Sequence, residues 1–433
     1  MHFYLEPGGK LVGSIRVPGD KSMSHRVIML GAIAEGKTDV SGFLEGEDAL
    51  STLGAFRNMG VMISEPESGR LSIEGVGLRG LQAPTGIMDV GNSGTSIRLM
   101  AGLLAGQTFS SVLTGDQSLL RRPMARVITP LSQMGAVISS REGCPPLEIS
   151  GGRKLRGVHY ELPVASAQVK SSVLLAGLFA EGFTSVVEPA PTRDHTERML
   201  TGFGYAVEVE SGSIGLEGGG TLQGTRVDIP ADISSAAFFM VGASIAEGSD
   251  LVLEHVGINP TRDGVIRILK AMGADIESSN ERDVGGEPVA DLRIRSAPLR
   301  GIDIPVEEVP LAIDELPAIL IAAACAEGVT VLRGAEELRV KESDRIASMA
   351  EGLTQLGISN TVHSDGITVI GGDIGGGIIA THHDHRIAMS FAMAALRASD
   401  RIKVSDCAHV ATSFPGFAEL AARVGLRLDV ADT

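Results

Sequence analysis

One structural unit repeats six times along the chain, and this repetition constrains the fold more than any other feature of the sequence. An apolar, helix-like segment ends six times at a turn similar to Ala-Glu-Gly, at residues 34–36, 105–106, 180–182, 246–248, 326–328 and 398–400. A second helix-like segment alternates with the first, and each copy ends at a glycine followed by a strand-like run. A glycine after the last turn is a common helix C-cap. The period is roughly 65 to 85 residues, and each unit is predicted to be β-α-β-α-β-β.

The repeat predicts an α/β (α+β) fold with two similar globular domains. One unit cannot bury both helices and a sheet face alone, whereas three units around a pseudo-threefold axis can. We expect the first domain at residues 20–230 and the second from residues 1–19 together with 231–433. The strand expected at residues 11–17 precedes the first complete helix and should pair with the last units. A long α/β chain with coincidental turns is the alternative, and six ordered alternations disfavour it.

Small or polar residues open the first helix of every unit. These openings are residues 19–22, 91–95, 165–168, 232–235, 314–317 and 384–386. Helix N-termini present free N–H groups and the positive end of the helix dipole. Repeated units would bring these ends to one cleft between the two domains, which predicts an anion-binding site. The chain itself carries a formal net charge of −16, which argues against nucleic acid or an anionic membrane as a partner.

The first of these openings also carries side chains suited to anions. Asp20 is a good N-cap, and Lys21, Ser22 and Arg26 occupy the first turns of the helix. Ser22 and Arg26 are four residues apart and share a face. An ordinary capped amphipathic helix with solvated charges is the alternative on this stretch alone.

Charged stretches elsewhere add further candidates. Lys341 and Arg345 would share a helix face with Glu342 beside them, although a salt-bridged exposed helix would look similar. Asp314 opens a very apolar helix, where it is either only an N-cap or a general base. Arg122 belongs to an arginine pair suited to forked recognition of carboxylate or phosphate.

The histidine-rich run at residues 382–386 looks at first sight like a set of metal ligands. Adjacent residues of a tight run point in different directions, and the sequence shows no second cluster to complete the shell. An Asp cap followed by His and Arg fits anion binding better, so no metal is predicted. The three cysteines are too far apart for a zinc motif and odd in number, which predicts a reducing compartment. With no signal peptide and no long apolar run, we expect a cytoplasmic protein.

Taken together, these stretches resemble the 5-enolpyruvylshikimate-3-phosphate synthase family, and its second class more than its first. The resemblance covers essentially the whole chain. It rests on PGDKSMSHR, GNSGTSIR, LLRRPM, SAQVKSS, NPTRDG, DELPAIL, RVKESDR and DHRIAMSF in the family's order. The family fold has two domains of three β-α-β-α-β-β units each, as the repeats predict independently.

The resemblance implies transfer of the enolpyruvyl group of phosphoenolpyruvate to the 5-hydroxyl of shikimate 3-phosphate, with release of phosphate. It implies no metal or organic cofactor, and we expect a monomer. The catalytic residues implied are Asp314 as the base, Glu342 as the acid and Lys21. Those implied for shikimate 3-phosphate are Lys21, Ser22, Arg26, Ser166, Ala167, Gln168, Arg193, Asp314 and Lys341. Those implied for phosphoenolpyruvate are Lys21, Gly94, Arg122, Gln168, Arg345 and Arg386.

The chain departs from the family's first class at two places. That class has a Lys just before Thr-Phe-Pro, whereas residues 411–415 here read Ala-Thr-Ser-Phe-Pro, so one cationic contact to phosphoenolpyruvate is in doubt. It also has an Asn shortly before Arg-Val-Lys-Glu, where this chain has Glu337 and Leu338. Gly94 stands where Ala is associated with resistance to glyphosate, so we expect a glyphosate-sensitive enzyme.

Two rivals differ in specific features. The sister enzyme that acts on UDP-N-acetylglucosamine pairs its first Lys with Asn and uses a loop Cys. Here Ser22 follows Lys21, and Cys144 lies at an expected strand entry. A repeat-built clamp on DNA would need basic residues along its inner helices, whereas the basic residues here cluster at helix starts.

Overall fold

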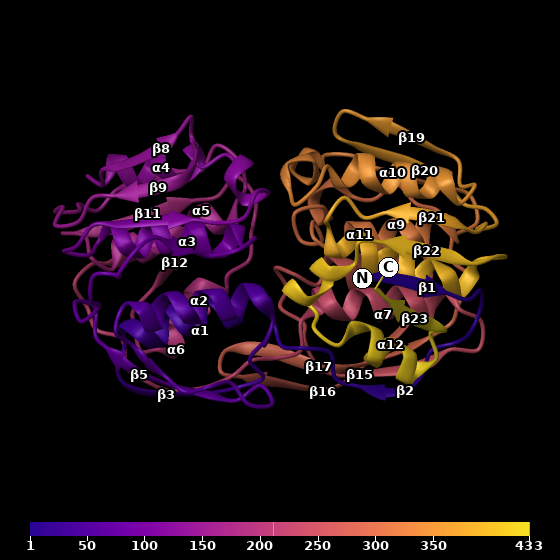
Figure 1. Ribbon diagram of the computed structural model, residues 1–433, viewed down its shortest axis with the longest axis horizontal. Coiled ribbons are helices and arrows are strands. Elements are labelled where there is room, and N and C mark those ends of the chain that lie inside the picture. Colours follow the sequence, from indigo (N-terminus) through magenta and orange to yellow (C-terminus); the bar gives the residue numbers. More distant parts are fainter. Residues whose placement is uncertain (211, 433) are drawn as a thin grey trace. The chain divides into compact units, whose positions relative to one another are not determined.

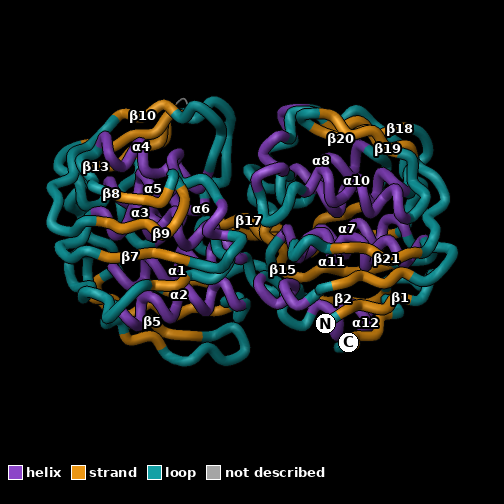
Figure 2. Tube along the Cα trace, turned by 45° about the horizontal axis from the view of Figure 1, so that its top comes forward, coloured by secondary structure: helices purple, strands orange, loops and turns teal. Residues whose placement is uncertain are grey.

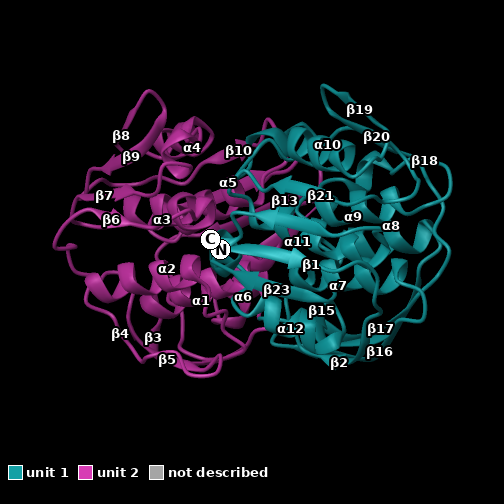
Figure 3. Cartoon of the chain, turned by 45° about the vertical axis from the view of Figure 1, so that its right-hand side comes forward, with its two compact units in different colours: residues 1–18, 230–433 teal, residues 19–229 magenta. Residues whose placement is uncertain are grey.

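The structure, a computed structural model, describes residues 1–210 and 212–432. The chain divides into two compact units, shown in different colours in Figure 3. Unit 2 is Gly19–Ile229, and unit 1 combines Met1–Pro18 with Pro230–Thr433. The chain therefore enters unit 2 after Pro18 and returns to unit 1 at Pro230.

Three small mixed sheets make up the strands described for unit 2. In each sheet, a central strand has one parallel neighbour on one side and an antiparallel pair on the other. The sheet orders are β14-β3-β5-β4, β6-β7-β9-β8 and β10-β11-β13-β12. The strands are β3 (Glu35–Ser41), β4 (Met62–Ile63), β5 (Leu71–Val76), β6 (Met88–Asp89), β7 (Ser111–Thr114), β8 (Ile138–Arg141), β9 (Cys144–Ile149), β10 (His159–Glu161), β11 (Phe183–Val187), β12 (Glu208–Glu210), β13 (Ser213–Glu217) and β14 (Arg226–Asp228).

Unit 1 follows the same plan within its described residues. Its sheets are β16-β17-β15-β2, β18-β20-β19 and β21-β22-β1-β23, and the second of them has isolated bridges in place of a full parallel edge strand. The strands are β1 (His2–Leu5), β2 (Val12–Ile15), β15 (Asp250–Gly257), β16 (Asp275–Val284), β17 (Glu287–Arg295), β18 (Val329–Leu332), β19 (Asn360–His363), β20 (Gly366–Ile370), β21 (Gly377–Ala380), β22 (Ile402–Ser405) and β23 (Leu428–Ala431).

The N-terminal segment contributes two strands rather than the single one expected at residues 11–17. β2 pairs in parallel with β15, and β14 pairs in parallel with β3. The strands that precede α1 (Lys21–Ile33) and α7 (Ile233–Ile245) are thus exchanged between the repeats. β1 lies between β22 and β23, so it completes the sheet of the last repeat. Residues 12–15 therefore pair outside unit 2, as expected, but with the fourth repeat, and it is β1 that pairs with the last repeat.

The first helix of each repeat is buried on nearly all sides, because most of its residues are small or apolar. These helices pack against one another inside each unit, with strands toward the outside (Figures 1 and 2). They are α1, α3 (Gly94–Ala105) and α5 (Ala167–Gly177) in unit 2, and α7, α9 (Leu316–Ala324) and α11 (His385–Ala394) in unit 1.

The second helix of each repeat is amphipathic. In α8 (Gly264–Ala271), for example, Val265, Ile268 and Leu269 are buried at the spacing of one helix face. The others are α2 (Glu47–Asn58), α4 (Ala125–Gln133), α6 (His195–Gly202), α10 (Arg345–Gln355) and α12 (Phe417–Val424). Short 3-10 helices are η1 (Leu119–Arg121), η2 (Val306–Glu308), η3 (Glu336–Val340), η4 (Ala395–Arg397) and η5 (Ala408–Thr412). Throughout residues 1–210 and 212–432, every helix is too short or too polar to cross a membrane.

Candidate active site

Side chains cap most of the inner helices where the sequence predicts their starts. In unit 2, Asp20 accepts a hydrogen bond from the Met23 N–H at 2.8 Å, Ser93 from Ser96 and Ser166 from Val169. In unit 1, Asp232 and Asp384 accept from N–H groups in the first turns of α7 and α11. These caps fix the orientation of the helix ends on which the candidate residues stand.

Arg26 is held firmly on the first turns of α1. It is 3% exposed, and its guanidinium donates to the Ser22 carbonyl at 2.9 Å, to Thr196 Oγ1 at 2.7 Å and to Ser171 Oγ at 2.9 Å. Lys21 forms a close ion pair with the buried Asp48 of α2. Arg26 thus links the first helix of the first repeat to both helices of the third.

Gly94 and two arginines form the second part of the unit 2 site. Arg122, 7% exposed, donates to Asn92 Oδ1 at 2.6 Å and to Ser118 Oγ at 3.2 Å. Arg98 donates to Gln168 Oε1 at 2.7 Å. A Cβ atom at Gly94 would lie 2.8 Å from Arg98 Nη1 and 3.0 Å from Arg122 Nη1. The glycine therefore leaves the space that both guanidinium groups occupy.

A buried histidine lies under this part of the site. His25 Nδ1 is 2.9 Å from Thr52 Oγ1, and its Nε2 is 3.3 Å from Ser93 Oγ, the cap of α3. Burial, followed by the charges of Lys21 and Arg26, holds the pKa of His25 well below its usual value. His25 is therefore neutral at pH 7 and joins α1, α2 and α3 through hydroxyl groups.

The third inner helix of unit 2 brings the remaining predicted residues. Ser166 caps α5, Ala167 is its first residue, and Gln168 donates to Thr95 Oγ1 at 3.1 Å. Arg193 is half-buried and lies just before α6. Unit 2 thus brings Ser166, Ala167 and Gln168 to one helix start and ties Gln168 to the first turn of α3.

Arg345 is the centre of the unit 1 site. It is 1% exposed, and its guanidinium lies 2.8 Å from Asp384 Oδ2, 3.1 Å from Asp314 Oδ1 and 2.6 Å from Glu342 Oε2. Burial alone would lower the pKa of Arg345, but the carboxylates of Asp384, Glu342 and Asp314 raise it. Burial likewise disfavours ionised Asp384, and the Arg345 guanidinium nevertheless keeps the pKa of Asp384 below its usual value.

Asp314 is not a helix cap. The N-cap position of α9 is Glu315, while the Asp314 carboxylate faces Arg345 and lies 3.7 Å from Lys341 Nζ. The Asp314 carbonyl accepts a hydrogen bond from Arg386 Nη1 at 2.8 Å. The reading of Asp314 as only an N-cap is therefore wrong, because its carboxylate faces two cations instead.

The family is decided by comparison with known proteins. The profile of the family described as EPSP synthase (3-phosphoshikimate 1-carboxyvinyltransferase) matches residues 5–420. The chain belongs to the EPSP synthase family. A 3-phosphoshikimate 1-carboxyvinyltransferase of Alkalilimnicola ehrlichii is 65% identical and matches 100% of this chain and 97% of its own. The corresponding protein of Methylococcus capsulatus is 63% identical over 99% of this chain and 98% of its own.

Solved structures of the EPSP synthase family have the same fold. A structure of EPSP synthase from Acinetobacter baumannii is 59% identical, covers 100% of both chains and has a TM-score of 0.90. The predicted two-domain α/β fold with repeated units is thereby confirmed. The sister-enzyme reading is disfavoured, because Cys144 opens strand β9 as expected.

One geometric expectation for this EPSP synthase family member is wrong. Lys341 and Arg345 do not share a helix face, because α10 begins only at Arg345 and Asp344 caps it by accepting from the Ala347 N–H. Lys341 follows the 3-10 helix η3 instead. Both cations meet at Asp314, so tertiary structure joins them where local helical spacing does not.

Sequence reasoning missed several buried residues around the EPSP synthase site. Arg98 and His25 lie in motifs that were singled out, yet neither was named. Lys170 is 1% exposed and pairs with Glu188 at 2.9 Å and Glu197 at 2.7 Å. Isolated charges at buried positions of an apolar helix were the signal that could have found Lys170 and Arg98.

Proposed function

We propose that the chain transfers the enolpyruvyl group of phosphoenolpyruvate to the 5-hydroxyl of shikimate 3-phosphate by addition and elimination. The family places it among 3-phosphoshikimate 1-carboxyvinyltransferases, which act on small anionic substrates. The observation that carries the assignment of roles is the carboxylate pair of Asp314 and Glu342, both held by the buried guanidinium of Arg345.

The cationic groups of unit 2 bind the anionic parts of the substrates. Lys21, Ser22, Arg26 and Arg193 are assigned to shikimate 3-phosphate, together with the start of α5 at Ser166, Ala167 and Gln168. Arg122 and the backbone at Gly94 are assigned to phosphoenolpyruvate, with help from Lys21 and Gln168. Arginine suits both substrates, because its planar fork matches carboxylate and phosphate oxygens.

The unit 1 residues move protons and hold the reacting groups. Asp314 accepts the proton of the 5-hydroxyl, so that the oxygen attacks C2 of the enolpyruvyl group. Glu342 donates a proton to the methylene carbon, while Lys341 lies beside the acceptor substrate. Arg345 and Arg386 hold phosphoenolpyruvate. Two carboxylates in different settings suit opposed acid and base roles.

The intermediate is a tetrahedral adduct in which both substrates are joined. It collapses when the C2–O bond to phosphate breaks and a proton leaves the methyl carbon, which regenerates the enol ether. Lys21 stabilises negative charge that develops on the leaving phosphate and the reacting centre. Phosphate is therefore released once per product formed.

Purified enzyme tests this proposal directly. Phosphate release should require both shikimate 3-phosphate and phosphoenolpyruvate, and omission of either should abolish it. Asp314→Asn should lower the turnover number by about 10²- to 10⁴-fold, which is the usual contribution of a general base. Asp275→Asn removes a surface carboxylate paired with Arg295 and serves as the matched control with near wild-type turnover. Wild-type turnover in Asp314→Asn would refute the assignment.

The state of the cysteines bears on the compartment in which the enzyme works. All three cysteines carry free thiols, and burial raises the pKa of Cys325 and of Cys407 to about 12. Unpaired thiols fit a reducing cytoplasm. The enzyme is further proposed to act as a monomer, which sedimentation analysis can test.

A further inference from the structure

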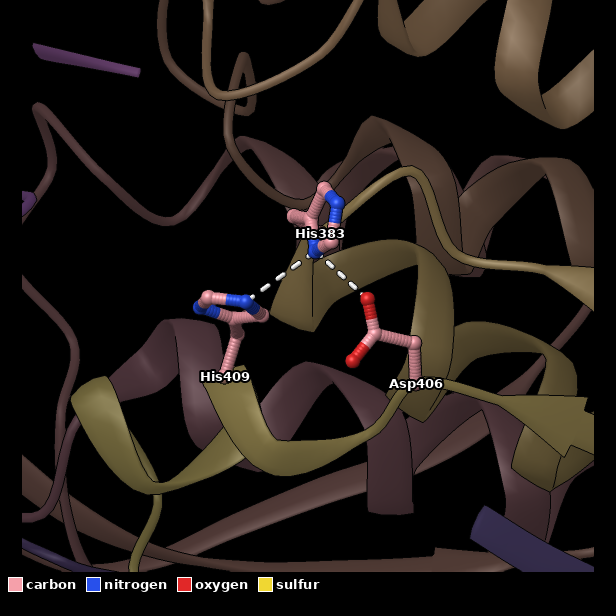
Figure 4. A group of neighbouring side chains, drawn as sticks. All are labelled: His383, Asp406 and His409. Atoms are coloured by element: carbon pink, nitrogen blue, oxygen red, sulfur yellow. Dashed lines mark hydrogen bonds and ion pairs between the residues drawn. The ribbon is translucent and has the colours of Figure 1, made fainter. Parts of the chain in front are cut away.

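A cluster of two histidines and one aspartate lies beside the unit 1 site (Figure 4). His383 precedes the cap of α11, Asp406 follows strand β22, and His409 stands in the 3-10 helix η5. Their nitrogen and oxygen atoms lie within 4.8 Å of one another. The reaction proposed above uses none of these side chains.

His383 Nδ1 lies close to both of the other side chains of the cluster. His383 Nδ1 lies 2.5 Å from Asp406 Oδ2 and 3.2 Å from His409 Nε2. A ring nitrogen carries either one proton or one lone pair, so His383 Nδ1 cannot serve both neighbours with a full hydrogen bond. A cation at the centre would instead accept a lone pair from each of the three groups.

The spacing suits a small divalent transition ion. Tetrahedral zinc with ligands at about 2.0–2.1 Å separates its ligand atoms by about 3.3 Å. The distance between the two histidine nitrogens already matches this value. His383 Nδ1 and Asp406 Oδ2 must separate by less than about 1 Å, which exposed side chains achieve by small rotations.

The backbone positions the cluster without the ion. His383 and Asp406 both have a φ of 61°, a left-handed conformation that is uncommon outside glycine. The Thr381 hydroxyl donates to the Asp406 carbonyl at 2.9 Å, which ties the loop before α11 to the loop after β22. The Asp406 N–H donates to His2 Nδ1 at 3.1 Å, and the Thr412 hydroxyl donates to the His409 carbonyl at 2.7 Å. These hydrogen bonds therefore hold the loops that carry the three side chains in place.

We propose that His383, Asp406 and His409 form a binding site for a divalent transition ion of the zinc class. Two imidazoles and one carboxylate are a common zinc donor set, and a fourth position remains for water. The ion would join the loop before α11 to η5. The sequence around residues 382–386 shows no second cluster of ligands, whereas the structure places Asp406 and His409 beside His383.

Cobalt binding to the untagged, full-length enzyme tests the site. After treatment with a chelator, Co²⁺ is titrated in, and its visible d–d absorption reports tetrahedral coordination. The wild-type enzyme should bind one equivalent of Co²⁺, and Zn²⁺ should displace it. His383→Asn, Asp406→Asn and His409→Gln should each weaken binding at least tenfold, because loss of a supporting group alone costs 10–100-fold. Asparagine tolerates the left-handed conformation at the first two positions.

A neighbouring histidine provides the matched control. His382 is exposed and its Nε2 lies 2.8 Å from Glu351, outside the cluster. His382→Asn should leave the Co²⁺ affinity within about twofold, far less than loss of a ligand causes. Circular dichroism confirms that each variant is folded, and Zn²⁺ should raise the melting temperature of the wild type and of His382→Asn only. Absence of d–d absorption, a wild-type Co²⁺ affinity in the three ligand variants, or loss of binding in His382→Asn would overturn the proposal.

Discussion

The two units are built from the same repeat, but they surround their buried arginines differently. In unit 2, the described hydrogen bonds of Arg26 and Arg122 end on hydroxyl, carbonyl and amide oxygens. In unit 1, Arg345 lies against the carboxylates of Asp314, Glu342 and Asp384. One scaffold therefore supports two kinds of electrostatic setting.

The difference lies in the side chains around the arginines rather than in the backbone. In both units, capping side chains start most of the inner helices, and these helices pack side by side. The partners of the arginines decide the chemistry: a guanidinium held by neutral groups suits anion binding, whereas a guanidinium among carboxylates holds those carboxylates in place. Similar folding units can thus be specialised without any change in backbone plan.

The largest expected effect contrasts Arg345→Gln with Arg122→Gln. Arg345→Gln leaves three carboxylates, including the fully buried Asp384, without their guanidinium, so the free energy of unfolding should fall by about 3–5 kcal/mol. Arg122→Gln leaves neutral Asn92 and Ser118 and should cost only about 1 kcal/mol. Urea denaturation of both variants measures the difference. Equal losses of unfolding free energy in the two variants would contradict the claim that Arg345 and Arg122 have different electrostatic settings.

A smaller effect is expected from Gly94→Ala. The added methyl group meets the ends of the Arg98 and Arg122 side chains, which must move. The proposed binding of phosphoenolpyruvate by Arg122 should therefore become weaker. A charge-assisted hydrogen bond contributes about 1.5–3 kcal/mol, so KM for phosphoenolpyruvate should rise about tenfold or more. Steady-state kinetics with saturating shikimate 3-phosphate give this value.

Glyphosate provides a second measurement at the same position. The wild-type enzyme should be inhibited at low glyphosate concentrations, and Gly94→Ala should resist it. Gly54→Ala is the matched control, because a Cβ at Gly54 meets nothing within 4 Å. If Gly94→Ala changed neither KM for phosphoenolpyruvate nor inhibition by glyphosate, Gly94 would have no part in phosphoenolpyruvate binding.

The smallest effect concerns His25 and pH. Because the folded protein holds the pKa of His25 below its unfolded value of about 6.5, the unfolded chain binds the proton first as pH falls. Stability should therefore be complete above about pH 6.5 and decline below it by at most about 1.4 kcal/mol per pH unit. His25→Gln should flatten this decline, whereas the control His159→Gln should not. The same slope in His25→Gln and wild type would contradict the assignment.

The fold was largely predictable, because it depends on periodic signals. Asp20 was predicted as a cap and forms the expected hydrogen bond, and Gly60, Gly135 and Gly425 take positive φ after helices as the repeat implied. β1 was missed, because four residues at a chain end carry no period. The exchange of β2 and β14 between repeats depends on tertiary pairing that local patterns do not encode.

The candidate site was less predictable, since its contacts join distant residues. Asp314 meets Arg345 and Lys341 only after α9 and α10 pack, and helical spacing placed the two cations on one face incorrectly. His383 belongs to a histidine-rich run in the sequence, but only the fold brings Asp406 of the loop after β22 beside it. The identity of a side chain suggests its chemistry, but the fold decides which side chains lie close enough to act together.

The most direct test of the division of labour is a kinetic comparison of Glu342→Gln with Arg122→Gln. Glu342→Gln should lower kcat by about 10²-fold or more and leave KM for phosphoenolpyruvate within about threefold, because a proton donor acts in the transition state. Arg122→Gln should instead raise KM for phosphoenolpyruvate about tenfold or more, because a charge-assisted contact is lost. A raised KM with unchanged kcat in Glu342→Gln would contradict the assignment of proton transfer to unit 1.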